Sequence, residues 1–291
     1  MVVDAANITP LASPLMHTAI RVRSDDGSEV AAYDFGGTGP ALLLGHATGF
    51  HAHAWLPVVA GLRARFRCYA WDARGHGASG PPASGDFAWR RSGEDARAVA
   101  AAFGLERPLA AGHSGSGAAL ILAEADHPGS WRALWLFEPV VPEPTAVAGD
   151  NPLEAVAMRR KDRFASRQDA LANFAAKPPF ASFAPDALRL YVEHGFVDDP
   201  DGSVTLACRR EDEAATYHEA VPANARARMP AMRLPVHVAV GALSTHFPPA
   251  AFAEAVALLP DGTLEVLGGV GHFGPFEDPP LVAASITAAL G

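Results

Sequence analysis

The run Gly112-His113-Ser114-Gly115-Ser116-Gly117 constrains the fold of this chain more than any other part of the sequence. An apolar run, 108–111, precedes it, and a helix-like run, 118–125, follows it. A serine flanked by small residues at a strand-to-helix junction has the pattern of a nucleophile elbow, in which a tight turn holds the serine hydroxyl clear of the sheet. The strict pattern has glycine two residues after the serine, where this chain has another serine. The run therefore predicts a strand, a sharp turn at Ser114 and a helix.

Apolar runs typical of buried strands alternate with helix-like segments on both sides of this turn. The expected strands are 18–23, 29–35, 41–44, 67–71, 132–137, 236–240 and 264–267, and the expected helices include 53–63, 91–103, 250–259 and 281–290. Such alternation predicts an α/β fold with a mostly parallel sheet that is covered by helices on both faces.

The alternation stops between residues 143 and 230, where the chain is more charged and lacks clear apolar strands. Runs such as 158–163 and 209–213 are typical of solvated helix faces, and 188–194 and 211–218 have helical patterns. We therefore expect a core made of 1–142 and 231–291, with a mainly helical lid at 143–230 inserted into it.

The composition limits the classes of partner. The chain has 291 residues, of which 49% are hydrophobic, and a formal net charge of −9. The acidic balance argues against nucleic acid and anionic lipid as partners, because both need a basic surface. No apolar run is long enough to span a membrane, and Met1 to Pro14 lack the basic start of a secretory signal. We expect a soluble cytoplasmic protein that acts on a small molecule.

A serine hydroxyl is a weak nucleophile at neutral pH, so Ser114 needs a base, an acid that orients the base, and an oxyanion hole. Of the 12 histidines, His272 is the best candidate for the base. It lies in the glycine-rich run 268–273, between the last expected strand and the last expected helix. Such a loop can bring an imidazole over the carboxyl edge of the sheet, where ligands bind in open α/β folds. The alternative is a histidine on a surface loop.

Two backbone amides are expected to form the oxyanion hole. One belongs to Gly115, directly after the nucleophile, and the other to Thr48, in the loop after an early strand. Phe50 and Phe273 lie close to these elements in the sequence and could shape an apolar substrate pocket.

His51 and His53 form a separate pair, but no acidic or histidine cluster accompanies them. This speaks against a metal site, and we expect the pair to line the pocket entrance or to cap the following helix. Cys68 and Cys208 are far apart in the sequence and have no metal-ligand spacing, so two idle thiols are expected. Neither a metal nor a cofactor is expected.

Four marks together make the chain resemble the α/β-hydrolase superfamily over nearly its whole length. They are the loop His46-Ala47, the segment Asp72 to Ser79, the Gly112-His113-Ser114 elbow and Gly271-His272. The resemblance implies the α/β-hydrolase fold and a catalytic triad. It also implies that Asp72 to Ser79 form a structural turn, so the charges there and His76 are not candidates for catalysis.

The position of the acidic residue of the triad departs from the commonest pattern of that superfamily. Most relatives carry an aspartate in the loop after the strand that is 236–240 here, but this chain has Ser244 there, which cannot be anionic. Some branches place the acid after the strand that precedes the lid. That residue here is Glu138, 24 residues after Ser114. Alternatively, Glu138 caps the hinge of the lid or pairs with an arginine.

The resemblance implies a serine hydrolase that cleaves a carboxylic ester or lactone of a small to medium apolar substrate through an acyl-enzyme. Ser114, His272 and Glu138 would form the triad. A serine nucleophile argues against haloalkane dehalogenase and epoxide hydrolase chemistry, which needs a carboxylate. Other possibilities are a carbon–carbon bond hydrolase on diketone-like substrates, a lyase or cofactor-free oxygenase, and a non-catalytic ligand-binding homologue. The oligomeric state is not indicated.

Overall fold

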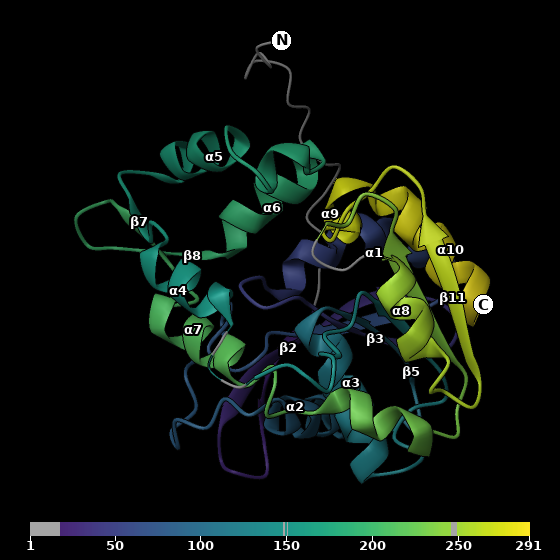
Figure 1. Ribbon diagram of the computed structural model, residues 1–291. Helices are drawn as coiled ribbons and strands as arrows, with labels where there is room; N and C mark the ends of the chain where they lie inside the picture. The colour runs from purple at the N-terminus through teal and green to yellow at the C-terminus, as the bar shows by residue number, and fades with distance from the viewer. Residues whose placement is uncertain (1–17, 148, 150, 246–248) are drawn as a thin grey trace.

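The computed structural model describes residues 18–147, 149, 151–245 and 249–291. Met1 to Pro14, interpreted above, lie outside the described residues. An eight-stranded sheet forms the centre of the molecule (Figure 1). In spatial order its strands are β1 (Thr18–Arg23), β2 (Glu29–Gly37), β4 (Arg67–Trp71), β3 (Ala41–Gly45), β5 (Leu109–His113), β6 (Leu134–Phe137), β10 (Val236–Gly241) and β11 (Gly262–Leu267). Within this sheet the β1–β2 and β2–β4 pairs are antiparallel, and the other neighbouring strands are parallel.

Helices cover both faces of this sheet. On one face α1 (Leu56–Leu62) packs against α10 (Pro279–Leu290), and on the other lie α2 (Trp89–Ala102), α3 (Gly115–Asp126) and α8 (Pro249–Val256). The central strands are apolar in both directions. Leu42 and Leu44 of β3 face the α1 side and Leu43 faces the α3 side, all fully buried. The prediction of an α/β-hydrolase fold with a mostly parallel sheet is confirmed.

Most of the chain between β6 and β10 forms a separate layer, drawn at the left of Figure 1, whereas its last helix, η4 (Ala225–Ala231), packs against α3 of the core. The elements of this segment are α4 (Pro152–Arg159), β7 (Arg163–Phe164), α5 (Arg167–Ala175), η3 (Phe180–Ser182), α6 (Pro185–His194), β8 (Phe196–Asp198), β9 (Val204–Leu206), α7 (Arg210–His218) and η4. Beside its helices the segment contains a small antiparallel sheet of β7, β9 and β8, which the sequence analysis did not identify. Strands of two or three residues are too short to produce an apolar run in the sequence.

Aromatic side chains join this layer to the core. Phe50, from the loop after β3, packs between Phe183 and Tyr191 of the inserted segment and Phe276 of α9 (Gly274–Glu277). Helix α6 also contacts η2 (Ala52–Trp55) of the core. No described helix is long and apolar enough to cross a membrane.

The close approach of strand β5 to helix α3 is testable with Gly112→Ala. A Cβ atom at this position would lie 2.8 Å from the Cα and 2.9 Å from the N of Gly117, neither of which can move without displacing α3. We expect the free energy of unfolding, measured by urea titration, to fall by about 1–3 kcal/mol. Gly268→Ala is the control, because no other heavy atom lies within 4 Å of its new Cβ. Equal unfolding midpoints for the two variants would contradict this account.

Candidate active site

Ser114 occupies the sharp turn between β5 and α3. Its backbone has φ 56° and ψ −117°, a conformation that is strained for a residue with a side chain. The Ser114 N–H donates to the carbonyl of Phe137 at 2.9 Å, which anchors the turn to the next strand. The neighbouring Ser116, where the strict pattern has glycine, donates its hydroxyl to the carbonyl of His46 at 2.5 Å. This serine therefore ties the elbow to the loop after β3.

Glu138 leaves the sheet beside Ser114, because His113 and Phe137 are register partners at the ends of β5 and β6. Its side chain is fully buried, and its backbone has a positive φ of 41°. An isolated buried carboxylate is costly, so its partners decide whether it can stay ionised.

Three donors converge on this carboxylate. Oε1 accepts from the N–H of Gly241 at 2.8 Å, and Oε2 accepts from the Ser244 hydroxyl at 2.9 Å and from His272 Nδ1 at 2.6 Å. The alternative that Glu138 pairs with an arginine does not hold, because none of these three donors is a guanidinium. These three bonds replace the water that the carboxylate loses on burial.

His272 lies in the loop between β11 and α9 and is held at two atoms. Its Nδ1 donates to Glu138, which leaves Nε2 as the basic nitrogen of the neutral ring. Its backbone carbonyl accepts a hydrogen bond of 2.8 Å from Nε2 of His113, the residue before Ser114. Because burial lowers the pKa of His113 well below its ordinary value, that ring stays neutral and donates through Nε2.

Thr48 and Gly115 lie next to each other. A Cβ atom at Gly115 would be only 2.8 Å from the Thr48 hydroxyl oxygen. The loop before Thr48 is fixed by His46, whose Nδ1 donates to the carbonyl of Ala47 and whose Nε2 accepts from the N–H of Ala73. Burial also lowers the pKa of His46 well below its usual value, so this ring acts as a neutral structural link.

The structure shows the Asp72 to Ser79 segment as a structural turn. The buried carboxylate of Asp72 accepts from the Tyr33 hydroxyl and from the backbone N–H groups of Ala52 and Ala78. These bonds connect the segment to β2 and to η2. The carboxylate of Asp72 therefore has a structural role.

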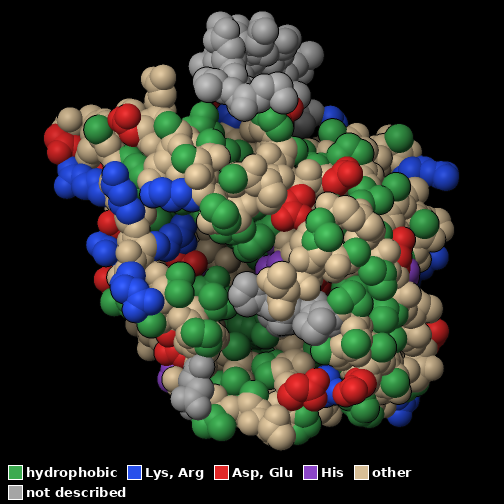
Figure 2. Space-filling view, turned by 45° about the horizontal axis from the view of Figure 1, so that its top comes forward, with side chains coloured by type: hydrophobic (Ala, Val, Ile, Leu, Met, Phe, Trp, Pro, Cys, Tyr) green, Lys and Arg blue, Asp and Glu red, His purple; other side chains and the backbone are tan. Residues whose placement is uncertain are grey.

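Phe50 and Phe273 meet at a ring-centroid distance of 5.7 Å. Phe50 is buried among the aromatic side chains that join the inserted segment to the core, whereas Phe273 is half-buried and lies next to His272. Figure 2 shows this face of the molecule hollowed near its middle, with a histidine in the hollow and hydrophobic side chains around it.

The histidine pair His51 and His53 lies between the core and α6. His51 is the N-cap residue of η2 but makes no capping hydrogen bond with its side chain. Instead its Nε2 donates to the carbonyl of Tyr191 at 3.1 Å. The His53 ring stacks on His194, with the ring centroids 3.9 Å apart. Both residues therefore join the core to α6.

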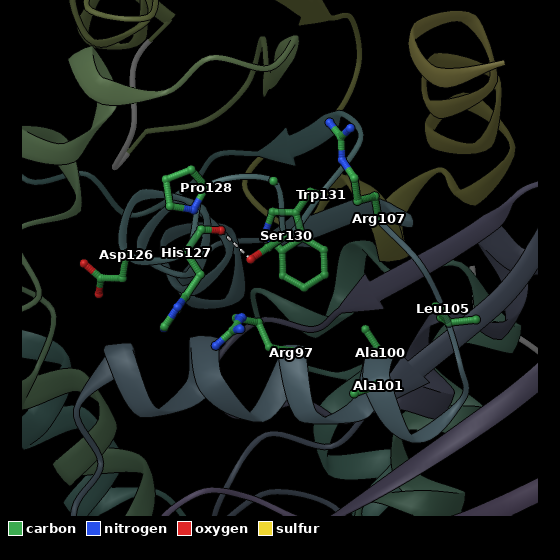
Figure 3. Close-up of a pocket in the computed structure, with 11 residues that line it drawn as sticks. Arg97, Ala100, Ala101, Leu105, Arg107, Asp126, His127, Pro128, Ser130 and Trp131 are labelled. Carbon is green, nitrogen blue, oxygen red and sulfur yellow. Dashed lines mark hydrogen bonds between the residues drawn. The ribbon is translucent and has the colours of Figure 1, made fainter.

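A second hollow lies at the opposite edge of the sheet, where β5 and β6 begin (Figure 3). Its volume is about 500 Å³, and it lies between the end of α2 and the loop after α3. Its lining includes Arg97, Arg107, His127 and Trp131. None of the candidate catalytic groups contributes to it.

Sequence reasoning missed two contacts of the site. Ser244 was considered only as a replacement for the acid, yet it binds Glu138; its place in the usual acid loop was the available signal. The contact of His113 with the His272 carbonyl has no signal in the sequence, because 159 positions separate the two residues.

Within the described ranges, no three His, Cys, Asp or Glu side chains form a group that could hold a metal ion. Cys68 and Cys208 are free and buried.

Comparison with known proteins gives a family match. The model of the family described as "Alpha/beta hydrolase family" matches residues 42–285. A fluoroacetate dehalogenase from Burkholderia sp is 32% identical over 107 residues, which is 35% of each protein. The chain aligns with only about a third of the length of the curated relatives that it matches.

Solved structures are similar over nearly the whole chain. E-2-(acetamidomethylene)succinate hydrolase has a TM-score of 0.82 at 22% identity, covering 94% of this chain and 99% of the other. The N-formylmaleamic acid deformylase of Pseudomonas putida S16 has a TM-score of 0.75 at 19% identity, covering 94% and 100%. At such low identity the two likenesses show the fold alone.

The buried histidines should make stability depend on pH. Burial is the main cause that lowers the pKa of four of them, His46, His51, His76 and His113. Below a pH of about 6.5 the unfolded chain binds protons that the folded chain does not, so the free energy of unfolding should decrease as the pH falls. Each group can contribute up to about 1.4 kcal/mol per pH unit.

His113→Gln separates one of these contributions, because the amide keeps a donor toward His272 but does not titrate. Urea unfolding between pH 7.5 and 5.5 should give a smaller slope of unfolding free energy against pH for this variant than for the wild type, by a difference that approaches one proton toward pH 5.5. An unchanged slope would mean that His113 is protonated in the folded protein.

Proposed function

The chain belongs to the alpha/beta hydrolase family, and we propose that it is a serine hydrolase that cleaves a carboxylic ester or lactone of a small to medium, mostly apolar substrate through an acyl-enzyme. The observation that carries the proposal is the 2.6 Å hydrogen bond from His272 Nδ1 to the buried carboxylate of Glu138. A carboxylate that orients an imidazole beside the turn of a strained serine is the arrangement that serine nucleophiles require.

In the proposed reaction, His272 Nε2 takes the hydroxyl proton of Ser114 as the oxygen attacks the carbonyl carbon. Glu138 holds the ring in the productive tautomer and stabilises its cation. The backbone N–H groups of Gly115 and Thr48 donate to the oxyanion, and the short approach between these residues supports this pairing. His272 then protonates the leaving alcohol and activates the water that releases the acid.

Ser244 explains how Glu138, which follows β6, can serve as the acid of the triad in this chain. Its hydroxyl donates to the same carboxylate oxygen that His272 binds, so it supports Glu138 from the loop where most relatives have their acid. We infer that Ser244 is a positioning residue. The carboxylate keeps three donors and can orient the imidazole without an aspartate in that loop.

Aromatic side chains define the expected apolar side of the substrate site. Phe273 is half-buried beside His272 and is the better candidate for substrate contact, and Phe50 supports it from the buried side. Two solved relatives are named for cleavage of an acetamido compound and of an N-formyl amide, so amides belong in a substrate panel beside esters and lactones.

Hydrolysis of p-nitrophenyl esters with acyl chains of two to eight carbons tests the proposal directly. The wild type should release nitrophenol, and Ser114→Ala should lower kcat by at least about 10³-fold, because it removes the nucleophile and leaves the fold unchanged. Equal rates for the two proteins would refute the role of Ser114. If neither protein turns over esters, lactones or amides, carbon–carbon cleavage of diketone-like substrates or ligand binding without turnover becomes the better explanation.

The acid has its own test. Glu138→Gln should lower kcat by about 10²- to 10⁴-fold with little change in KM, because an amide cannot stabilise the imidazolium. Ser244→Ala removes one of three donors to Glu138 and should lower kcat by less than about 10-fold. Unfolding curves serve as the control for folding. A Glu138→Gln enzyme with wild-type kcat would exclude Glu138 from the triad.

A further inference from the structure

The inserted segment buries an ion pair that the catalytic groups do not use. Arg160, directly after α4, donates through Nη1 to Oε2 of Glu213 on α7 and through Nη2 to the Tyr191 hydroxyl on α6 at 2.6 Å. The side chains of Arg160 and Glu213 are 16% and 8% exposed. Because charged side chains are seldom buried without a reason, this pair calls for an explanation.

The pair lies against the loop of the proposed oxyanion hole. A Cβ atom at Gly49 would be 2.6 Å from Glu213 Oε1 and 3.5 Å from Arg160 Nη1. Gly49 directly follows Thr48, whose hydroxyl oxygen would be 2.8 Å from a Cβ atom at Gly115. The guanidinium and carboxylate therefore lie beside the groups expected to bind the scissile carbonyl.

Much of the hydrogen-bonding capacity of this cluster is unused. A guanidinium has five N–H groups, and among the described residues Arg160 uses two of them. The hydroxyl of the neighbouring Tyr217, also on α7, has no hydrogen bond to any described residue. Burial raises the pKa of Tyr217, so its hydroxyl keeps its proton and can donate. Neither the unused Arg160 N–H groups nor the Tyr217 hydroxyl belongs to the buried polar atoms that lack a partner. These donors therefore reach solvent and are open to an acceptor on a ligand.

We propose that Arg160 and Tyr217 form a polar subsite that donates hydrogen bonds to an oxygen acceptor on the acyl part of the substrate, either a carboxylate or an amide carbonyl. The inference rests on the proposed function and narrows its substrate class: the acyl part is otherwise apolar and carries a polar oxygen that reaches Arg160 and Tyr217. Glu213 balances the charge of Arg160 while the subsite is empty. A carboxylate therefore competes with Glu213 for the guanidinium, whereas an amide does not.

Three p-nitrophenyl esters of equal chain length test the subsite: the pentanoate, the glutarate monoester and the glutaramate. The wild type should cleave at least one of the two polar esters about 10- to 100-fold better in kcat/KM than the pentanoate. Glu213→Gln separates the two acceptors, because it frees the guanidinium: it should raise kcat/KM for the glutarate monoester if the acceptor is a carboxylate and leave the three-ester ratio unchanged if it is an amide.

Arg160→Met alone would leave Glu213 buried without its partner, so the main variant is the double substitution Arg160→Met with Glu213→Gln. It should abolish the preference for polar esters, so that kcat/KM for the three esters lies within about 3-fold of one another. Arg163→Gln is the matched control: this exposed arginine of the same segment binds Asp199 and Asp201 at the surface. Its preference among the three esters should equal that of the wild type.

A binding measurement keeps the subsite testable independently of turnover. Ser114→Ala is titrated by calorimetry with the methyl esters of the same three acids, and one polar ester should bind at least about 10-fold more tightly than methyl pentanoate. The inference is overturned if the pentanoate is preferred in both assays, or if the double variant lowers all three esters equally. Binding with this preference but without hydrolysis by the wild type would instead refute the proposed function and retain the subsite.

Discussion

The buried carboxylate of Glu138 is the constraint on which the site depends. A charge with no exposure can persist only where donors replace water, and here one backbone amide, one hydroxyl and one imidazole do so. Each donor comes from a different part of the chain's last third. The end of β10 and the loops that follow β10 and β11 must therefore take these positions for β6 to end as it does.

The sequence was most informative where one element decides its own structure. Short apolar runs predicted the central strands of the main sheet within a few residues, because strands buried on both faces need apolar side chains at every position. The glycines around Ser114 predicted the tight turn, because such a turn admits only small side chains beside the serine. The short strands β7, β8 and β9 escaped, since pairing with one another, and no local pattern, makes them strands.

In the candidate site, too, the sequence predicted what depends on local patterns and missed contacts between remote segments. Ser114 and His272 could be proposed from local patterns, and Glu138 from its place at the end of a strand and from the resemblance. What could not be predicted are contacts between remote segments: His113 with the carbonyl of His272, and Arg160 with Glu213 against Gly49. In particular, the charged runs of the inserted segment are typical of solvated surfaces, and only the fold separates the half-buried Arg160 from its exposed neighbours.

The partners of Glu138 also bear on the order in which the protein can fold. All three of its donors lie more than 100 positions later in the chain, at Gly241, Ser244 and His272. During synthesis the first half of the sheet emerges while this carboxylate has only water as a partner. Burial of β6 must then wait until β10 pairs beside it, because an early burial would leave the charge uncompensated. The hydrogen bonds of this one side chain thus link the two halves of the sheet.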